Sequence, residues 1–146
     1  MYQFTLEPLL NHRKSVEDNL QKELGVCKTC LAEENRKLRT YKKEKNRVLG
    51  EMQQKQQEGI TVSENLLYFD FIDRLSRDLD KQKQRLSEVK KKYNRKHNEL
   101  IEAVKKRRIL EKLKEKQLDE YNQRLEKSER NFINEVAISQ FNRKSR

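Results

Sequence analysis

The sequence predicts an all-α fold in which two long helices pack against each other as an antiparallel coiled-coil hairpin. Three observations carry this prediction. First, the chain of 146 residues is 40% charged and only 33% hydrophobic, whereas a rounded core at this length normally needs about 45–50% apolar residues. Second, the apolar residues recur at heptad spacing in two long stretches, which a disordered chain would not show. Third, a polar break that contains Gly59 separates the two stretches.

The first helix is expected over about residues 5–53. Thr5 is a candidate N-cap, and Pro8 is tolerated in the first turn because the amides there have no partner within the helix. Fourteen positions recur in steps of four and three, and ten of them are apolar, as in a stripe that is buried against another helix. We call these positions the seam of this helix: Leu6, Leu10, Arg13, Glu17, Leu20, Leu24, Cys27, Leu31, Glu34, Leu38, Tyr41, Lys45, Val48 and Met52.

A connector is expected over about residues 54–62. Gly59 supplies its flexible point, and Thr61 with Glu64 has the spacing of a capping box, which marks the start of a helix. The second helix is therefore expected over about residues 63–140, with a frayed C-terminal tail.

The seam of the second helix has thirteen positions, ten of them apolar. Beyond Leu110 the apolar pattern continues only after an extra four-residue step, through Lys114 to Leu118. Such a stutter predicts local unwinding of the supercoil. The thirteen positions are Tyr68, Ile72, Leu75, Leu79, Gln82, Leu86, Val89, Tyr93, Lys96, Leu100, Ala103, Arg107 and Leu110.

Each seam is a narrow stripe that can be buried only against another helix, so the two helices should fold back on each other. At ~1.5 Å per residue the second helix is much longer than the first. We expect it to extend past the first helix beyond about residue 115. The whole chain, residues 1–146, should form a single coiled-coil domain.

The net charge of +11 is concentrated in residues 81–116, which hold fifteen Lys and Arg against five acids. Most of these cations lie off the seam, as on a solvated coiled-coil face, but residues 105–108 have no local acid for each cation. An acidic partner explains this excess. The alternative is a basic coiled coil that binds nucleic acid, but leucine-zipper binders carry their basic regions outside the zipper. Here the basic segment lies inside the seam, so we expect no nucleic-acid partner.

Residues that suggest chemistry are few. Cys27 and Cys30 have the spacing of zinc or redox pairs, but no second pair or nearby His completes four ligands. The pair also falls in mid-helix, away from the helix N-terminus that activates a redox thiol. His12 and His97 are isolated, and no glycine precedes the Lys-Ser or Lys-Thr of a phosphate loop. We expect no enzyme, no cofactor and no metal.

The segment "LLYFDFI", residues 66–72, holds more apolar side chains than one stripe can bury. Either these residues pack over the bend as a small core, or they form an exposed docking surface.

Residues 66–69 are also the longest uninterrupted apolar run in the chain. That run is far shorter than the ~20 residues of a membrane span, and the two cysteines fit a reducing cytosol.

Four segments, taken in order, resemble the FliJ family of flagellar export proteins. They are "FTLEPLLNHRKSVED" (residues 4–18), "GITVSENLLYFDFIDRL" (residues 59–75), "LKEKQLDEY" (residues 113–121) and "NEVAISQF" (residues 134–141). The order, spacing and total length of these segments make the match specific, and it covers essentially the whole chain. Asn134 stands where the family often has Asp, and the cysteine pair is not typical of the family.

The resemblance implies a non-enzymatic component of the flagellar type III export apparatus, similar in fold to the stalk subunit of rotary ATPases. Implied partners are the hexameric export ATPase and its regulator, the export-gate membrane protein, and export chaperones. The implied location is the cytoplasm, peripheral at the inner face of the cell membrane at the flagellar base. The alternative is another kind of coiled-coil adaptor.

Two sets of partner-binding residues follow from these expectations. The aromatic segment near the bend should contact the export gate through Tyr68, Phe69, Phe71, Ile72 and Leu75. The basic segment and the extension beyond it should contact the ATPase ring through Arg107, Arg108, Lys112, Leu118, Tyr121 and Leu125.

Overall fold

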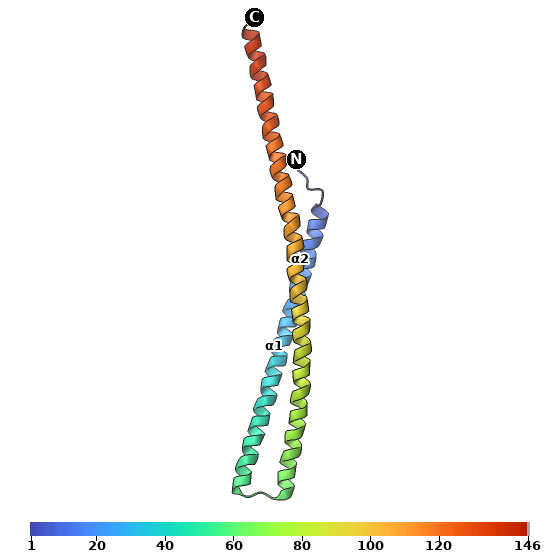
Figure 1. Cartoon of the computed structure of the whole chain (residues 1–146), viewed down its shortest axis with the longest axis vertical. Coiled ribbons are helices and arrows are strands. Elements are labelled where there is room, and N and C mark those ends of the chain that lie inside the picture. Colours follow the sequence, from blue (N-terminus) through green and yellow to red (C-terminus); the bar gives the residue numbers. More distant parts are fainter. Residues whose placement is uncertain (146) are drawn as a thin grey trace. The chain divides into compact units, whose positions relative to one another are not determined.

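The computed structural model describes residues 1–145, and its fold consists of two long helices. Helix α1 spans Glu7–Glu58 and helix α2 spans Val62–Lys144. Figure 1 shows the short connection between them, and no strand occurs within residues 1–145. The predicted all-α hairpin of two long helices is confirmed.

The helix ends differ from the expected ones by a few residues. Helix α1 continues to Glu58 instead of about residue 53, because the intervening Gln, Lys and Glu residues are good helix formers. It ends where Gly59 takes a positive φ of 100°, a conformation that costs glycine little. The backbone N–H of Glu64 donates to the Thr61 hydroxyl at 3.2 Å, which caps α2 as expected. Helix α2 continues to Lys144, past the expected end near residue 140.

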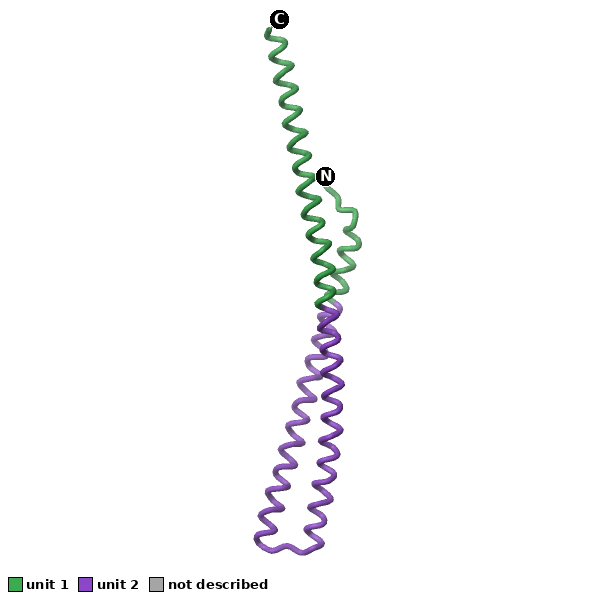
Figure 2. Tube along the Cα trace, viewed as in Figure 1, with its two compact units in different colours: residues 1–18, 101–146 green, residues 19–100 purple. Residues whose placement is uncertain are grey.

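The chain divides into two compact units, each with one segment from either helix running in opposite directions (Figure 2). We call residues 19–100 the hairpin unit, and residues 1–18 with residues from 101 onward the terminal unit. That the chain forms one coiled-coil domain stays a prediction.

The hairpin unit is held together by its seam. Val48 and Met52 of α1 are buried, as are Leu75, Leu79 and Leu86 of α2. All other seam positions of this unit are at least half-buried, which is the burial expected of a heptad stripe that faces a partner helix.

One buried seam residue of the hairpin unit is polar. The side chain of Gln82 is only 2% exposed, and its amide donates to the Glu34 carboxylate and, at 3.0 Å, to the Glu34 backbone carbonyl. The hydrogen bond from Gln82 lowers the pKa of the Glu34 carboxyl group. Because the amide is satisfied, its burial does not carry the penalty of an unpaired polar group.

The core of the terminal unit includes residues that precede the helix. Phe4 packs in one cluster with Leu10 and Leu110, and Tyr2 packs against that cluster. The rings of Tyr2 and Tyr121 lie 5.4 Å apart between centroids. The packed surface therefore reaches Tyr121, a few residues beyond the expected limit of about 115.

The expected stutter is present in the apolar pattern but not in the packing. Among the half-buried residues after Leu110, Lys114, Gln117 and Tyr121 keep the heptad spacing, while Leu118 is 38% exposed. The Tyr2 hydroxyl donates to the Gln117 side chain at 3.3 Å. The packed positions therefore run through Gln117, and Leu118 lies outside them, in the part of α2 that was expected to extend past the first helix.

Candidate partner-binding surfaces

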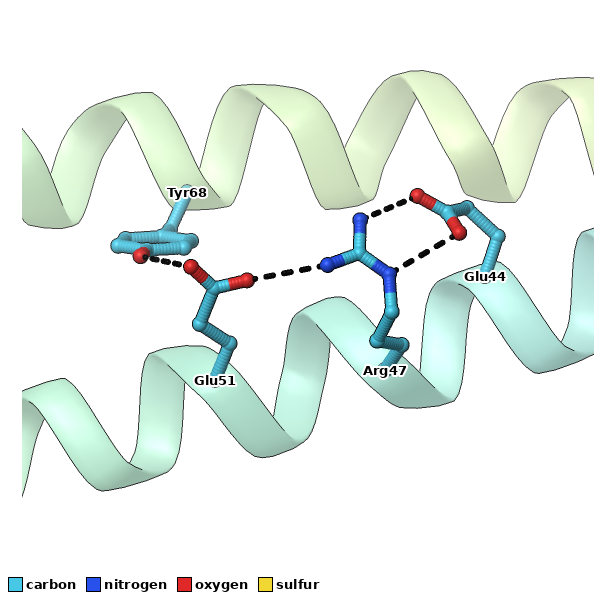
Figure 3. A network of polar contacts seen from close by, with 4 residues as sticks. All are labelled: Glu44, Arg47, Glu51 and Tyr68. Atoms are coloured by element: carbon cyan, nitrogen blue, oxygen red, sulfur yellow. Dashed lines mark hydrogen bonds and ion pairs between the residues drawn. The ribbon is translucent and has the colours of Figure 1, made fainter.

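Tyr68 is held in the hairpin unit by a polar network (Figure 3). Its hydroxyl donates to Glu51 at 3.2 Å, and Arg47 donates to Glu51 at 3.3 Å and to Glu44 at 2.6 Å. Desolvation, followed by the negative charge of Glu51, raises the pKa of the Tyr68 phenol. The bond with Glu44 raises the pKa of the Arg47 guanidinium and lowers that of the Glu44 carboxyl. The network fixes the direction in which the Tyr68 ring points.

The fixed ring of Tyr68 forms one wall of an open groove of about 330 Å³. Leu67 and Phe71 form its other apolar walls, and Lys55 of α1 and Glu64 of α2 line it as well. Both Leu67 and Phe71 are exposed. The groove thus combines apolar side chains with one cation and one acid, a lining typical of binding sites.

The five residues predicted to contact the gate do not form one surface. Leu75 is buried in the seam and Tyr68 and Ile72 are half-buried there, whereas Phe69 and Phe71 are exposed. Phe69 follows the seam residue Tyr68 and Phe71 precedes the seam residue Ile72, so the two phenylalanines flank the seam on opposite sides. The alternative interpretation, a small core over the bend, is wrong because Phe69 and Phe71 remain exposed.

Arg107 in the terminal unit has an intramolecular role that we did not predict. It is half-buried and donates to Glu17 across the seam and to Glu111 at 2.8 Å within α2. The bond to Glu17, followed by that to Glu111, raises the pKa of the Arg107 guanidinium. Sequence reasoning treated Arg107 as an unpaired cation, although its seam position and that of Glu17 could have indicated the pair.

The remaining residues predicted to contact the ring are mostly open to solvent. Arg108 and Lys112 are exposed, and within residues 1–145 neither forms an ion pair. Leu118 and Leu125 are exposed, and Tyr121 is half-buried against Tyr2. Exposed apolar residues continue along α2 at helical spacing. We call this set the tail stripe: Leu118, Leu125, Phe132 and Val136.

The cysteines and histidines do not gather. Cys27 is buried, Cys30 is exposed, and both thiols are free. His97 stacks on Tyr93 of the same helix with 6.1 Å between ring centroids. Among residues 1–145 there is no group of three or more His, Cys, Asp or Glu side chains placed to hold a metal ion. Across the same residues, neither helix has a stretch apolar enough to cross a membrane.

The fold is that of an α-helical coiled-coil hairpin with exposed apolar surfaces on both of its units. The family model of the flagellar FliJ protein matches residues 2–146, and the chain belongs to the FliJ family. This membership confirms the predicted family and makes the protein a component of the flagellar type III export apparatus.

A solved structure has a similar fold. It is CT670 from Chlamydia trachomatis, described as a YscO homologue, with 21% sequence identity and a TM-score of 0.53. The match covers 100% of both chains. At this identity the likeness concerns the fold alone. The comparison with curated proteins gave no match.

Proposed function

We propose that this protein is a non-enzymatic, stalk-like activator of the export ATPase ring that also links the ring to the export gate. The observation that carries the proposal is the tail stripe, a row of exposed apolar residues on α2, whose residues 122–145 are all exposed. Most helical stability in proteins comes from packing of an apolar face. A partner that covers the tail stripe would stabilise this part of α2, and the centre of a ring is a site that suits a single helix.

Exposed cations beside the tail stripe favour an acidic partner surface. Arg108 and Lys112 lie on the same helix within three turns of Leu118 and are free to pair with carboxylates. Charges of this kind speed association and orient the complex, while the apolar stripe supplies contact area. Arg107 belongs to the same predicted set, but its bonds to Glu17 and Glu111 make it a residue that also holds the terminal unit together.

The gate contact is proposed for the groove beside Tyr68. Phe71 and Leu67 offer exposed apolar surface there, and the bond from Tyr68 to Glu51 keeps the ring in place. Ile72 and Leu75, the other two seam residues of the predicted set, are half-buried and buried next to this segment. We further propose the ATPase regulator and export chaperones as partners, and a cytoplasmic location, peripheral at the inner face of the cell membrane.

The ring contact is tested by stimulation of the purified export ATPase across a salt series. Replacing Arg108 and Lys112 with Glu should remove the salt-sensitive part of the stimulation, because exposed charges are screened over about 8–10 Å at physiological ionic strength. Replacing Leu118 and Leu125 with Ala should weaken the stimulation at every salt concentration. Circular dichroism checks that both variants stay helical.

A matched control is Ile109→Ala with Val26→Ala, which removes two exposed apolar side chains outside the tail stripe. This control should stimulate the ATPase like the unaltered protein. If both test variants, still folded, also stimulate like the unaltered protein, the ring contact lies elsewhere and the proposal fails.

The gate contact needs a separate measurement of binding to the purified gate protein. Phe71→Ala should weaken binding without loss of helix, because the side chain is exposed. Leu75→Ala is a poor probe, since Leu75 is buried and its replacement should destabilise the hairpin unit. Unchanged gate binding of Phe71→Ala and of Leu67→Ala would exclude the groove as the contact.

A further inference from the structure

A second apolar surface lies on the side of α2 away from the groove. Val62, Leu66 and Phe69 are 79%, 57% and 52% exposed and recur at i, i+4 and i+7, so they line one face of the helix. We call these three residues the Phe69 face. None of them lines the groove of Leu67 and Phe71. The hairpin unit therefore presents two separate apolar surfaces near the connector.

The Phe69 face continues along α2 into acidic residues. Asp73 and Asp80 follow Phe69 at four and eleven residues, on the same side of the helix, and Asp70 directly follows Phe69 in the sequence. Arg77 pairs with Asp73 at 2.7 Å, which leaves more carboxylates than cations along this side. Residues 61–80 as a whole hold five acids and two cations, in contrast to the strongly basic segment that follows.

Helix α1 adds one apolar residue on the same side. Leu49 is exposed and follows the seam residue Val48, as Phe69 follows Tyr68. When two helices pack antiparallel, the residue after a seam position of one helix lies on the same side of the seam as the residue after the corresponding seam position of the other helix. The bond between Glu51 and Tyr68 shows that this part of α1 lies level with Phe69. A third helix laid along the Phe69 face could therefore contact both helices.

We infer that the Phe69 face docks a cationic amphipathic helix of a partner protein, separately from any partner in the groove. The three apolar residues form a row along α2 that can contact the apolar face of an amphipathic helix, whose own anchors recur at i, i+4 and i+7. The acids farther along the face would pair with Lys or Arg about three helical turns from the first anchor. The same acids repel an anionic membrane surface. The inference does not depend on gate or ring binding.

Two synthetic amphipathic peptides provide the test with the full chain. Both carry Leu at three positions spaced i, i+4 and i+7, and they differ only in having Lys or Glu at the positions one turn beyond. Fluorescence anisotropy of the labelled peptides measures binding. The Lys peptide should bind more tightly than the Glu peptide, and high salt should reduce the difference between them.

Paired variants separate the two surfaces. Leu66→Ser with Phe69→Ser should weaken binding of the Lys peptide by about tenfold or more, as loss of central anchor residues does. Leu67→Ser with Phe71→Ser makes the same chemical change in the groove and should leave that binding nearly unchanged. Asp73→Lys with Asp80→Lys should reverse the preference between the two peptides. All altered side chains are exposed, and circular dichroism checks that the variants stay helical.

Several results would overturn the inference. Equal affinity for the two peptides, or no binding of either, would exclude a cationic helix as the partner. An equal loss in the groove variant would show that the surfaces are not separate. A concentration-dependent dimer in light scattering that Phe69→Ser abolishes would mean that a second copy of the chain occupies the face. Binding to anionic vesicles through Phe69 would assign the face to a membrane.

Discussion

Two stretches of α2 in the terminal unit have a similar spacing of apolar residues but different surroundings. Residues 101–121 pack on residues 1–18 and bury Ala103 and Leu110, whereas every residue of 122–145 is exposed. Both stretches carry apolar residues at helical spacing among many charges. Periodic apolar residues therefore show which side of a helix can be buried, but a second segment must be present to bury it.

The polar residues of the two stretches differ in the same way. In the packed stretch, half-buried cations pair across the seam, Arg107 with Glu17 and Lys114 with Glu7 at 2.8 Å. In residues 122–145 the ion pair is Arg130 with Glu126, within one helix and at 3.9 Å. Cross-seam pairs fix which residues of the two segments meet, while a pair within one exposed helix adds little.

The largest expected effect comes from removing a core side chain of the packed stretch. Leu10 is 1% exposed, so Leu10→Ala should lower the free energy of unfolding by about 2–5 kcal/mol. Leu125→Ala makes the same change in the exposed stretch and should cost less than about 0.5 kcal/mol. Urea unfolding followed by circular dichroism measures both. Equal losses would show that residues 122–145 are packed in the free protein.

The next effect concerns the cross-seam ion pair. Glu17 is buried, so Glu17→Lys places two cations together away from solvent and should lower the melting temperature by several degrees. Exchanging the charges, Glu17→Arg with Arg107→Glu, should recover part of the loss, because the exchange restores the cross-seam pair but places a like charge four residues before Glu111. Glu126→Lys is the matched reversal in the exposed stretch and should leave the melting temperature nearly unchanged. If the exchange recovers nothing, the pair does not act through its charges.

Much of the fold could be predicted from the sequence, because a heptad stripe has only one way to be buried in a two-helix hairpin. Val48 and Leu79 are buried where their seam positions placed them. The bend also falls at Gly59, whose positive φ suits a residue without a side chain. The heptad spacing and the glycine of the bend are local features of the sequence, and they were sufficient to predict the two helices and the position of the bend.

Other features of the packing depend on contacts between distant residues and could not be predicted. Phe4 and Tyr2 lie before the helix, outside any heptad pattern, yet they form part of a core. Gln117, seven residues after Leu110, is half-buried in place of the apolar Leu118, and it accepts a hydrogen bond from Tyr2. The spacing of apolar residues predicts which face of α2 is buried, but it does not predict which residue of segment 1–18 packs against that face.

The candidate site was predicted less completely than the fold. Phe69 and Phe71 were grouped because they are close in sequence. Residues that are two positions apart on a helix point in nearly opposite directions, however, so the two rings lie on different sides. Arg107 was taken for a free cation because its acid lies ninety residues away in the sequence. Which of these residues bind a partner stays a prediction.

A smaller effect should appear as acid sensitivity of the hairpin unit. The hydrogen bond from Gln82 lowers the pKa of Glu34 below its ordinary value of 4.5. A carboxyl group with a lowered folded-state pKa stabilises the fold above its unfolded pKa, and this contribution is lost as the pH falls through the folded value. The melting temperature should therefore drop below about pH 4.5, and Gln82→Leu should reduce the size of that drop.

Gln84→Leu is the control for this measurement, because Gln84 is an exposed glutamine two residues away on the same helix. Thermal unfolding from about pH 6 to about pH 3 would be compared for the two variants and the unaltered protein. The control should keep the full acid dependence. An identical pH profile for Gln82→Leu and the control would mean that Glu34 does not contribute.

The smallest effect is expected at the two cysteines, which repeat the comparison between buried and exposed positions within one helical turn. Cys27 lies in the seam, so Cys27→Ala should lower the free energy of unfolding by about 1 kcal/mol through lost packing. Cys30 is exposed, so Cys30→Ser should change the free energy of unfolding by less than about 0.5 kcal/mol. Within residues 1–145 the two thiols do not belong to a group of three or more side chains that could hold a metal ion. We therefore expect no metal-binding role for them, and the double variant should restore motility to cells that lack the natural protein. Swimming in soft agar measures this, with urea unfolding as the check on folding. Loss of motility in a folded double variant would show that the pair has a role beyond packing.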